Sequence, residues 1–258
     1  MIEMSVVMPL YRVKYVGWLS FESLIKQEGI DFKWELIIAE ENSGEHFGNS
    51  FLEKNFYDAL HKIGCSKIVY KELSQWIPLS KKYRILTELC NSPLWTLAVG
   101  DYYSPAKRLK TCYNSFKRND WDFYRTPQLI FYDFISGKWV VRRVASRGAC
   151  CKAVRMDIAK QVYYDDIRWK GLDGWFFKQC QKVKPNLKEY VEKSDYWKSG
   201  FNTHGFNNLS DDRTRKIANN SHKFLKFDVT QSTIPQDVIE RLKTTKCNLG
   251  KHRLGDFE

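Results

Sequence analysis

Residues 4–8 read MSVVM, an uninterrupted apolar run of strand length near the start of the chain. Further apolar runs follow, each separated from the one before by a stretch with helical periodicity. The expected strands are Met4–Met8, Trp34–Ala39, Ile68–Tyr70 and Leu94–Val99, and the expected helices between them are Gly17–Gln27, Leu52–Ile63 and Ser80–Leu89. This alternation predicts an α/β fold, a doubly wound, mostly parallel sheet with helices on both faces. Ligands bind such sheets at the carboxyl ends of the strands.

The chain changes character after residue 105. A helix is expected over Pro105–Phe116, and the β-rich runs Phe123–Tyr132 and Lys138–Val144 predict a hairpin around Ser136-Gly137. A strand over Gly148–Val154 and a helix over Gly171–Val183 follow. Residues 184–233 are polar and predict a long loop region over the crevice, and a capping threonine with an early proline predicts a short final helix near residues 235–244.

Composition limits the class of protein. The 258 residues are 43% hydrophobic and 15% aromatic, which excludes disordered, collagenous and coiled-coil chains. No stretch is apolar enough to cross a bilayer, and charges follow the start too soon for a signal peptide, so we expect a cytoplasmic protein without integral membrane contact. The 7 cysteines lack CxxC spacing and predict free thiols in a reducing compartment, with neither a disulfide framework nor a zinc site.

Polar residues directly follow three of the expected strands. Pro9 and Tyr11 come after the first strand, Glu40 and Glu41 after the second, and Asp101 after the fourth. Because right-handed crossovers place these strand ends along one crevice, we expect the three groups to outline a single site.

The segments at these positions resemble those of the family 2 glycosyltransferases, inverting enzymes of GT-A fold that use nucleotide sugars. SVVMPLY (5–11) is similar to the family's opening strand, ELIIAEENS (35–43) to its strand ending in paired acids, and AVGDYYSP (98–105) to its aspartate-rich metal motif. RGACCKAVRMDIAKQV (147–162) and GLDGWFFKQC (171–180) resemble the acceptor-side strand and the helix with the catalytic acid. The resemblance is spread in order over residues 4–185.

The resemblance implies one GT-A domain over residues 1–258. Its nucleotide-sugar-binding half would be residues 1–105, and its acceptor-side half, with a smaller mixed sheet, residues 106–185. Residues 186–258 would be the polar loop region with the C-terminal helix and tail.

The resemblance also implies a donor site. Glu40 or Glu41 would contact the uracil or ribose, with Pro9 and Tyr11 as the floor beneath the base. Asp101 would hold Mg2+ or Mn2+ on the diphosphate, although the family has two or three acids there and this chain has Val99 and Tyr102 beside a single one. The alternative for Asp101 is a cap on the following helix.

Three further residues are candidates for the donor phosphates. His204, in NTHGFN, is similar to a family histidine that returns to the metal or the diphosphate. Lys82 and Arg84 align with the helix before the metal motif, and the alternative for both is an exposed helical face. UDP-glucose is the most frequent donor in the family.

The catalytic base implied by the resemblance is Asp173. An inverting transfer needs one group that deprotonates the acceptor hydroxyl opposite the diphosphate. Asp165 and Asp166 are the fallback candidates, and a helix N-terminal acid without catalytic function is the alternative for Asp173. Trp169 and Trp175 bracket the base and are expected to stack on the acceptor.

The positive net charge of the chain is a further indication of which acceptor it binds. Lys and Arg number 42 against 30 Asp and Glu, a net charge of +12. Basic clusters that include Lys107 and Arg108, and Arg142 and Arg143, are either solvated faces or contacts to a phosphate backbone. If these clusters contact a phosphate backbone, we expect a phage-type enzyme that is active in the host cytoplasm. It would glycosylate a flipped base of duplex DNA that is hydroxymethylated or already glycosylated.

Two alternatives to a DNA acceptor stay open. One is a cytosolic enzyme that builds surface polysaccharide or glycolipid. The other is a non-catalytic protein that binds nucleotide sugars or nucleic acid and has lost the metal site, as the single acid at Asp101 suggests.

Overall fold

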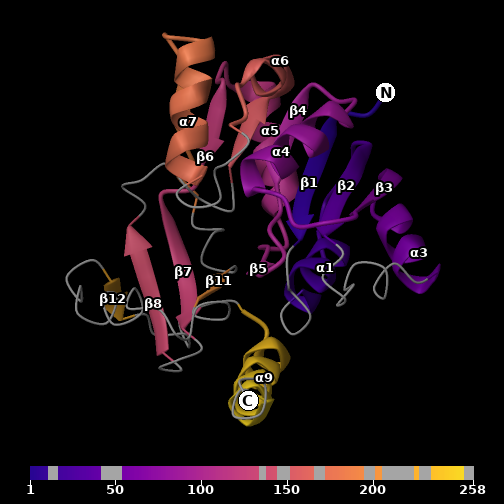
Figure 1. The fold of residues 1–258 in the computed structure, drawn as a ribbon, viewed down its shortest axis with the longest axis vertical. Coiled ribbons are helices and arrows are strands. Elements are labelled where there is room, and N and C mark those ends of the chain that lie inside the picture. The colour runs from indigo at the N-terminus through magenta and orange to yellow at the C-terminus, as the bar shows by residue number, and fades with distance from the viewer. Residues whose placement is uncertain are drawn as a thin grey trace.

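The computed structural model describes residues 1–10, 17–41, 54–133, 138–143, 152–165, 172–194, 201–204, 224–226 and 234–252. A seven-stranded sheet forms its centre, in the order β10-β6-β9-β4-β1-β2-β3 (Figure 1). The strands are β1 (Met4–Leu10), β2 (Trp34–Glu41), β3 (Cys65–Leu73), β4 (Leu94–Leu97), β6 (Phe123–Arg125), β9 (Ala153–Arg155) and β10 (Glu189–Val191). β1 is parallel to both β2 and β4, β2 is parallel to β3, and β9 runs antiparallel to β4 and β6. The predicted doubly wound, mostly parallel sheet is confirmed.

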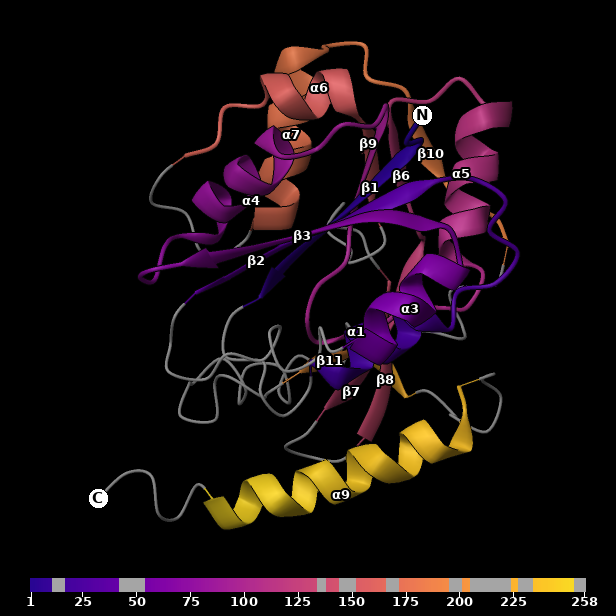
Figure 2. The ribbon, with the colours of Figure 1, turned by 90° about the vertical axis from the view of Figure 1, so that its right-hand side faces the viewer.

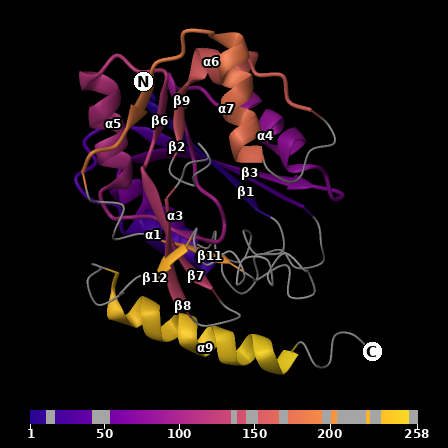
Figure 3. The same ribbon diagram turned by 90° about the vertical axis from the view of Figure 1, so that its left-hand side faces the viewer.

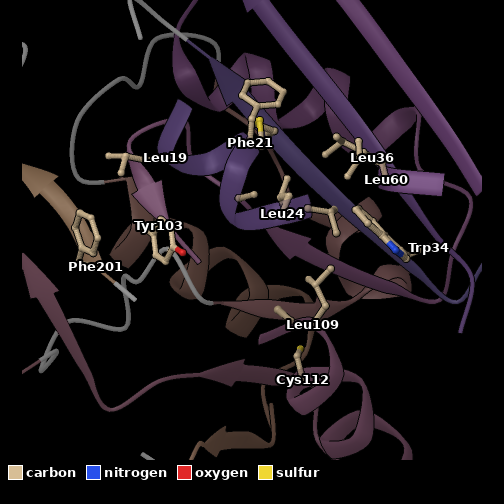
Figure 4. Packing of buried hydrophobic residues seen from close by; sticks show 14 of the residues in the cluster. Leu19, Phe21, Leu24, Trp34, Leu36, Leu60, Tyr103, Leu109, Cys112 and Phe201 are labelled. Carbon is tan, nitrogen blue, oxygen red and sulfur yellow. The ribbon is translucent and has the colours of Figure 1, made fainter. Parts of the chain in front are cut away.

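Alternate side chains of the central strands enter two different cores. Val6 and Met8 of β1 pack with α1 (Trp18–Ile25), α3 (Lys54–Lys62) and α5 (Arg108–Arg118), whereas Val7 packs with α4 (Leu79–Glu88), α6 (Met156–Gln161) and α7 (Leu172–Val183). Figure 2 shows the two sets of helices on opposite faces of the sheet. Figure 4 shows part of the first core, where Phe21, Leu36 and Leu60 meet. Burial on both faces explains why these strands are continuous apolar runs.

A second, smaller sheet has the order β12-β8-β7-β11-β5. Its strands are β5 (Tyr102–Tyr103), β7 (Gln128–Asp133), β8 (Lys138–Arg143), β11 (Phe201–His204) and β12 (Phe224–Lys226). β11 is parallel to β7 and antiparallel to β5, so this sheet is mixed, as expected. Tyr103 stacks on Phe201 at 5.6 Å between ring centroids. The helix α9 (Gln236–His252) buries Val238 and Leu242 in the same core.

The expected strand Phe123–Tyr132 is two strands in two different sheets. It breaks between Arg125 and Gln128, at Thr126-Pro127. Proline has no backbone N–H for a ladder, so the chain leaves the large sheet here and enters the small one. The predicted hairpin partner is correct, since β7 and β8 pair antiparallel from Asp133 and Lys138 outward.

The expectation of a structureless region over residues 184–233 is wrong in three places. β10, β11 and β12 are strands of three or four residues within it, and each pairs with a strand distant in sequence. Strands this short carry no periodicity that the sequence could reveal. The helix α6 was not predicted, and α9 runs eight residues beyond its expected end at residue 244.

The described part of the chain has no helix that combines the length and the apolar character needed to span a membrane. Cys65, Cys90, Cys112 and Cys180 are buried free thiols.

Three of these thiols make the stability of the folded chain depend on pH in the alkaline range. Burial raises the pKa of Cys65, Cys90 and Cys180 from 9.0 to about 12. The folded chain therefore holds these protons more tightly than the unfolded chain does. The resulting stability is fully present below pH 9 and is lost as the pH rises towards 12. We expect the urea midpoint to fall across this range, and to fall less steeply in Cys180→Ala. A midpoint that stays constant from pH 8 to 11 would contradict this expectation.

Candidate active site

The ends of three neighbouring strands form the candidate site. β1 ends at Leu10, which is in register with Glu40 near the end of β2. On the other side of β1, the Ala98 N–H donates to the Val7 carbonyl at 2.8 Å, so the chain after β4 leaves the sheet beside β1 and turns at Asp101. Pro9, the acids Glu40 and Glu41, and Asp101 therefore lie at or just after the ends of adjacent strands.

Lys82 of α4 joins two of these strand ends. Its Nζ donates to the Leu10 carbonyl at 2.7 Å and lies 2.5 Å from Glu41 Oε2. Both side chains of the ion pair are 2% exposed, and burial lowers the pKa of Lys82 although Glu41 opposes that shift. Lys82 is therefore not on an exposed helical face. Its partners are the Leu10 carbonyl and the Glu41 carboxylate, at the ends of β1 and β2. Arg84, one half-turn further along α4, is half-buried.

The paired acids at the end of β2 have different partners. Glu40 Oε2 accepts a hydrogen bond from the Tyr70 hydroxyl of β3 at 2.8 Å, whereas Glu41 faces Lys82. The hydrogen bond to Glu40 and burial both raise the pKa of Tyr70, with burial the larger cause. Each acid is thus held by a side chain from a neighbouring element, and Pro9 lies buried in β1 beside them.

Asp101 occupies the turn between β4 and β5 and is half-buried. The alternative interpretation, in which it caps the next helix, is wrong, because α5 begins seven residues later with Lys107 at its N-cap. The turn is closed by a hydrogen bond from the Tyr102 N–H to the Val99 carbonyl. From α1, the Ser20 hydroxyl donates to the same carbonyl at 2.6 Å.

Asp173 is the second residue of α7, and Figure 3 shows α7 on the same face of the sheet as α4. Phe176, one turn further on, fixes the helix by stacking on Trp95 of β4 at 5.1 Å and meeting Tyr83 of α4 edge-on at 6.0 Å. The first turn of α7 is thus anchored on β4, the strand that leads into the Asp101 turn. Trp175 is half-buried beside Tyr164, with ring centroids 6.4 Å apart.

Several predicted residues fall outside the described part of the chain. Tyr11, Asp166 and Trp169 lie in undescribed segments. Arg142 and Arg143 lie on β8 and His204 on β11, but their side chains, like that of Asp173, are outside the described residues. Asp165 is described, and its carbonyl accepts from the Ser80 hydroxyl of α4.

The prediction that Arg108 contacts a DNA backbone is wrong. Arg108 is 1% exposed, and its guanidinium donates to Ser104, Thr96 and the Leu97 carbonyl, so it does not present its charge to a DNA backbone. Lys107 beside it is exposed.

Sequence reasoning also missed two residues near these strand ends. One is the half-buried Tyr70, and the other is Lys152, which is fully buried with Nζ 5.2 Å from the ring centroid of Phe176. Tyr70 lies in no motif, and Lys152 lies within the segment 147–162, where nothing distinguishes it from a surface lysine.

Comparison with known proteins identifies the architecture. The full TarS chain of S. aureus superposes with a TM-score of 0.60 at 12% identity, over 96% of this chain and 43% of that one. TarS 1–349 in complex with UDP-GlcNAc gives a TM-score of 0.63 at 12% identity, over 99% of this chain and 75% of that one. The fold is GT-A-like. The complex of TarS 1–349 with UDP gives a TM-score of 0.60 at 12% identity, over 96% and 71% of the two chains.

The chain therefore spans less than half of full TarS. No family model matches the sequence, and none of the curated proteins matches it either.

The Lys82–Glu41 pair gives a test of the site's construction. Lys82→Met should lower the free energy of unfolding by about 3–5 kcal/mol, because the Glu41 carboxylate would stay buried without its partner. The double variant Lys82→Met, Glu41→Gln should recover most of that loss, measured by urea unfolding. Lys81→Met, on the same helix, is the control and should cost less than about 1 kcal/mol. A double variant no more stable than Lys82→Met alone would show that the pairing is not the cause.

Proposed function

We propose that this chain is an inverting glycosyltransferase that moves a sugar from a UDP-sugar to a hydroxyl acceptor. One observation carries the proposal: the Asp101 turn and the acids Glu40 and Glu41 lie at neighbouring strand ends of a GT-A-like sheet, and α7, which carries Asp173, packs on the adjoining strand β4. The likeness to TarS, which has been solved with UDP and with UDP-GlcNAc, supports a UDP-sugar as the donor.

The donor would lie across the ends of β1, β2 and β4. Glu40 or Glu41 would read the uracil or ribose by exchanging its present partner, Tyr70 or Lys82, for the donor, and Pro9 would line the floor. Asp101 is the group that would hold a divalent cation on the diphosphate. The described residues contain no cluster of three metal-ligating side chains. A single carboxylate fits this use, because Mg2+ in nucleotide sites takes one or two carboxylates and completes its shell with phosphate oxygens and water.

The chemistry assigned to the chain's own residues is a proton transfer. Asp173 accepts the proton of the acceptor hydroxyl while that oxygen bonds to the anomeric carbon, and the bond from this carbon to the diphosphate breaks on the opposite face. UDP leaves with the electron pair, and the sugar's configuration is inverted. When bound, the cation would neutralise charge that develops on the leaving diphosphate.

Two features favour a saccharide acceptor over DNA. Arg108, one of the predicted contacts to a DNA backbone, is buried, and the exposed Lys107, Lys117 and Arg118 lie at the two ends of α5, which Figure 2 shows on the opposite face of the sheet from α4 and α7. Trp175, two residues after the proposed catalytic base Asp173, is half-buried, and an aromatic ring in that setting can stack on the face of a sugar ring.

A donor and acceptor panel tests the proposal. The protein is incubated with UDP-GlcNAc, UDP-glucose and other UDP-sugars, with Mn2+, and UDP release is measured without acceptor, with a polysaccharide polymer, and with plain and hydroxymethylated duplex DNA. UDP release from one donor, increased by the polymer, supports the proposal. Increase by DNA alone would restore the DNA acceptor, and tight UDP binding without release would identify a non-catalytic binding protein.

Asp173→Asn tests the catalytic base. The amide keeps the size of the side chain but accepts no proton, so transfer should fall by about 100- to 10,000-fold while the UDP dissociation constant stays within a few fold. Asp165→Asn is the matched control and should transfer normally. Near-normal transfer by Asp173→Asn would instead make Asp165 or Asp166 the base.

Asp101→Ala tests the route through a cation. We expect EDTA to suppress transfer by the wild type. In isothermal titration, Asp101→Ala should weaken UDP binding with Mn2+ far more than in EDTA, because the carboxylate acts through the cation. Equal wild-type activity with and without chelator would assign the neutralisation of the diphosphate to protein cations or His204.

A further inference from the structure

Arg108 is a charged side chain in the interior of the protein. It is the first residue of α5 and is 1% exposed. Its Nη1 donates to Ser104 Oγ at 2.9 Å, and its Nη2 donates to Thr96 Oγ1 at 3.2 Å and to the Leu97 carbonyl. The guanidinium also lies over the Tyr102 ring, 5.7 Å from its centroid.

These partners flank the turn that carries Asp101. Leu97 is the last residue of β4, and Ser104 directly follows β5, so one guanidinium connects both ends of residues 98–103. A separate bridge holds the helix start, because Gln27, two residues beyond α1, donates to the Pro105 carbonyl at 2.8 Å and accepts from the Leu109 N–H at 3.0 Å.

The chemistry of this contact is particular to arginine. A planar guanidinium directs several N–H donors along fixed directions and can bond to two groups at once, which a lysine ammonium does not reproduce. Burying a charge carries a large desolvation penalty, and an apolar side chain would fill the same space without that penalty. What arginine provides at this position, and an apolar side chain would not, is therefore the set of hydrogen bonds to Leu97 and Ser104.

We propose that Arg108 is a positioning residue that closes residues 98–103 into one conformation and so sets Asp101 for the donor diphosphate. The second half of this inference rests on the proposed function, and the first half does not. Arg108 itself would not touch the substrate. It acts through the segment whose two ends it holds.

Hydrogen–deuterium exchange tests the closure without any ligand. Arg108→Gln should speed exchange at the amides of residues 99–104 by about 10- to 100-fold, since hydrogen bonds from a charged donor are lost. Lys110→Gln, which removes the ion pair with Asp31 from the same helix, is the control and should leave that exchange unchanged. Ser104→Ala removes one partner and should give a smaller increase, which keeps the test valid if Arg108→Gln unfolds. Unchanged exchange in Arg108→Gln or Ser104→Ala would overturn the inference.

A double-mutant cycle tests the link to Asp101. UDP dissociation constants with Mn2+ are measured for Asp101→Ala, for Arg108→Gln and for the double variant. If Arg108 acts through Asp101, each single variant weakens UDP binding by about 10-fold or more, and the double variant is no weaker than Asp101→Ala. Additive losses would overturn the positioning role. A wild type that does not bind UDP would refute the proposed function instead, and the exchange measurement would still decide whether Arg108 closes the segment.

Discussion

The structure depends on one constraint, the burial of the parallel strands on both faces. β1 and β2 are buried at every residue, so their side chains have no route to solvent except at the strand ends. The polar residues inside them are paired: the Ser5 hydroxyl donates to Glu35 at 2.6 Å, and Glu35 also accepts from the Asn91 N–H. Groups that act on a ligand must then lie at the strand ends or follow them. Glu40 and Glu41 are the last two residues of β2, and Asp101 follows β4.

Three buried cations lie around these strand ends, each with its own kind of partner. Lys82 pairs with Glu41 and the Leu10 carbonyl, Arg108 with Ser104 and the Leu97 carbonyl, and Lys152 lies over the rings of Tyr83 and Phe176. Fixed charges and dipoles in a water-poor site need little reorganisation when charge develops on a bound ligand. The net charge of +12 suggested a surface that binds polyanions. These three cations, however, are buried and hold neighbouring parts of the protein together.

Local pattern predicted the fold of residues 1–105 well and that of the later residues poorly. Runs such as Met4–Met8 and helices such as α4 have a periodicity that the core imposes, and the acids at the strand ends followed from topology. The edge strand β3 extends over Cys65–Leu73, beyond the three predicted residues, because it is mostly exposed or half-buried and lacks an apolar run. β10, β11 and β12 are held by partners far away in sequence. Lys82 and Arg108 looked like surface cations because sequence does not reveal which face of a helix meets another strand end.

The segment after β4 connects the two halves of the candidate site. Asp101 lies in its turn, and the next two residues form β5, which pairs with Phe201 and Asn202 of β11 in the second sheet. Asp101 and a strand of the second sheet are therefore adjacent in the chain, and the stacking of Tyr103 on Phe201 fixes that strand against β11. A shift of residues 98–103 would move β5 and disturb its pairing with β11, whose last residue is His204. The position of the large sheet's strand ends relative to the second sheet thus depends on how firmly this segment is held, and Arg108 and Ser20 hold it from α5 and α1.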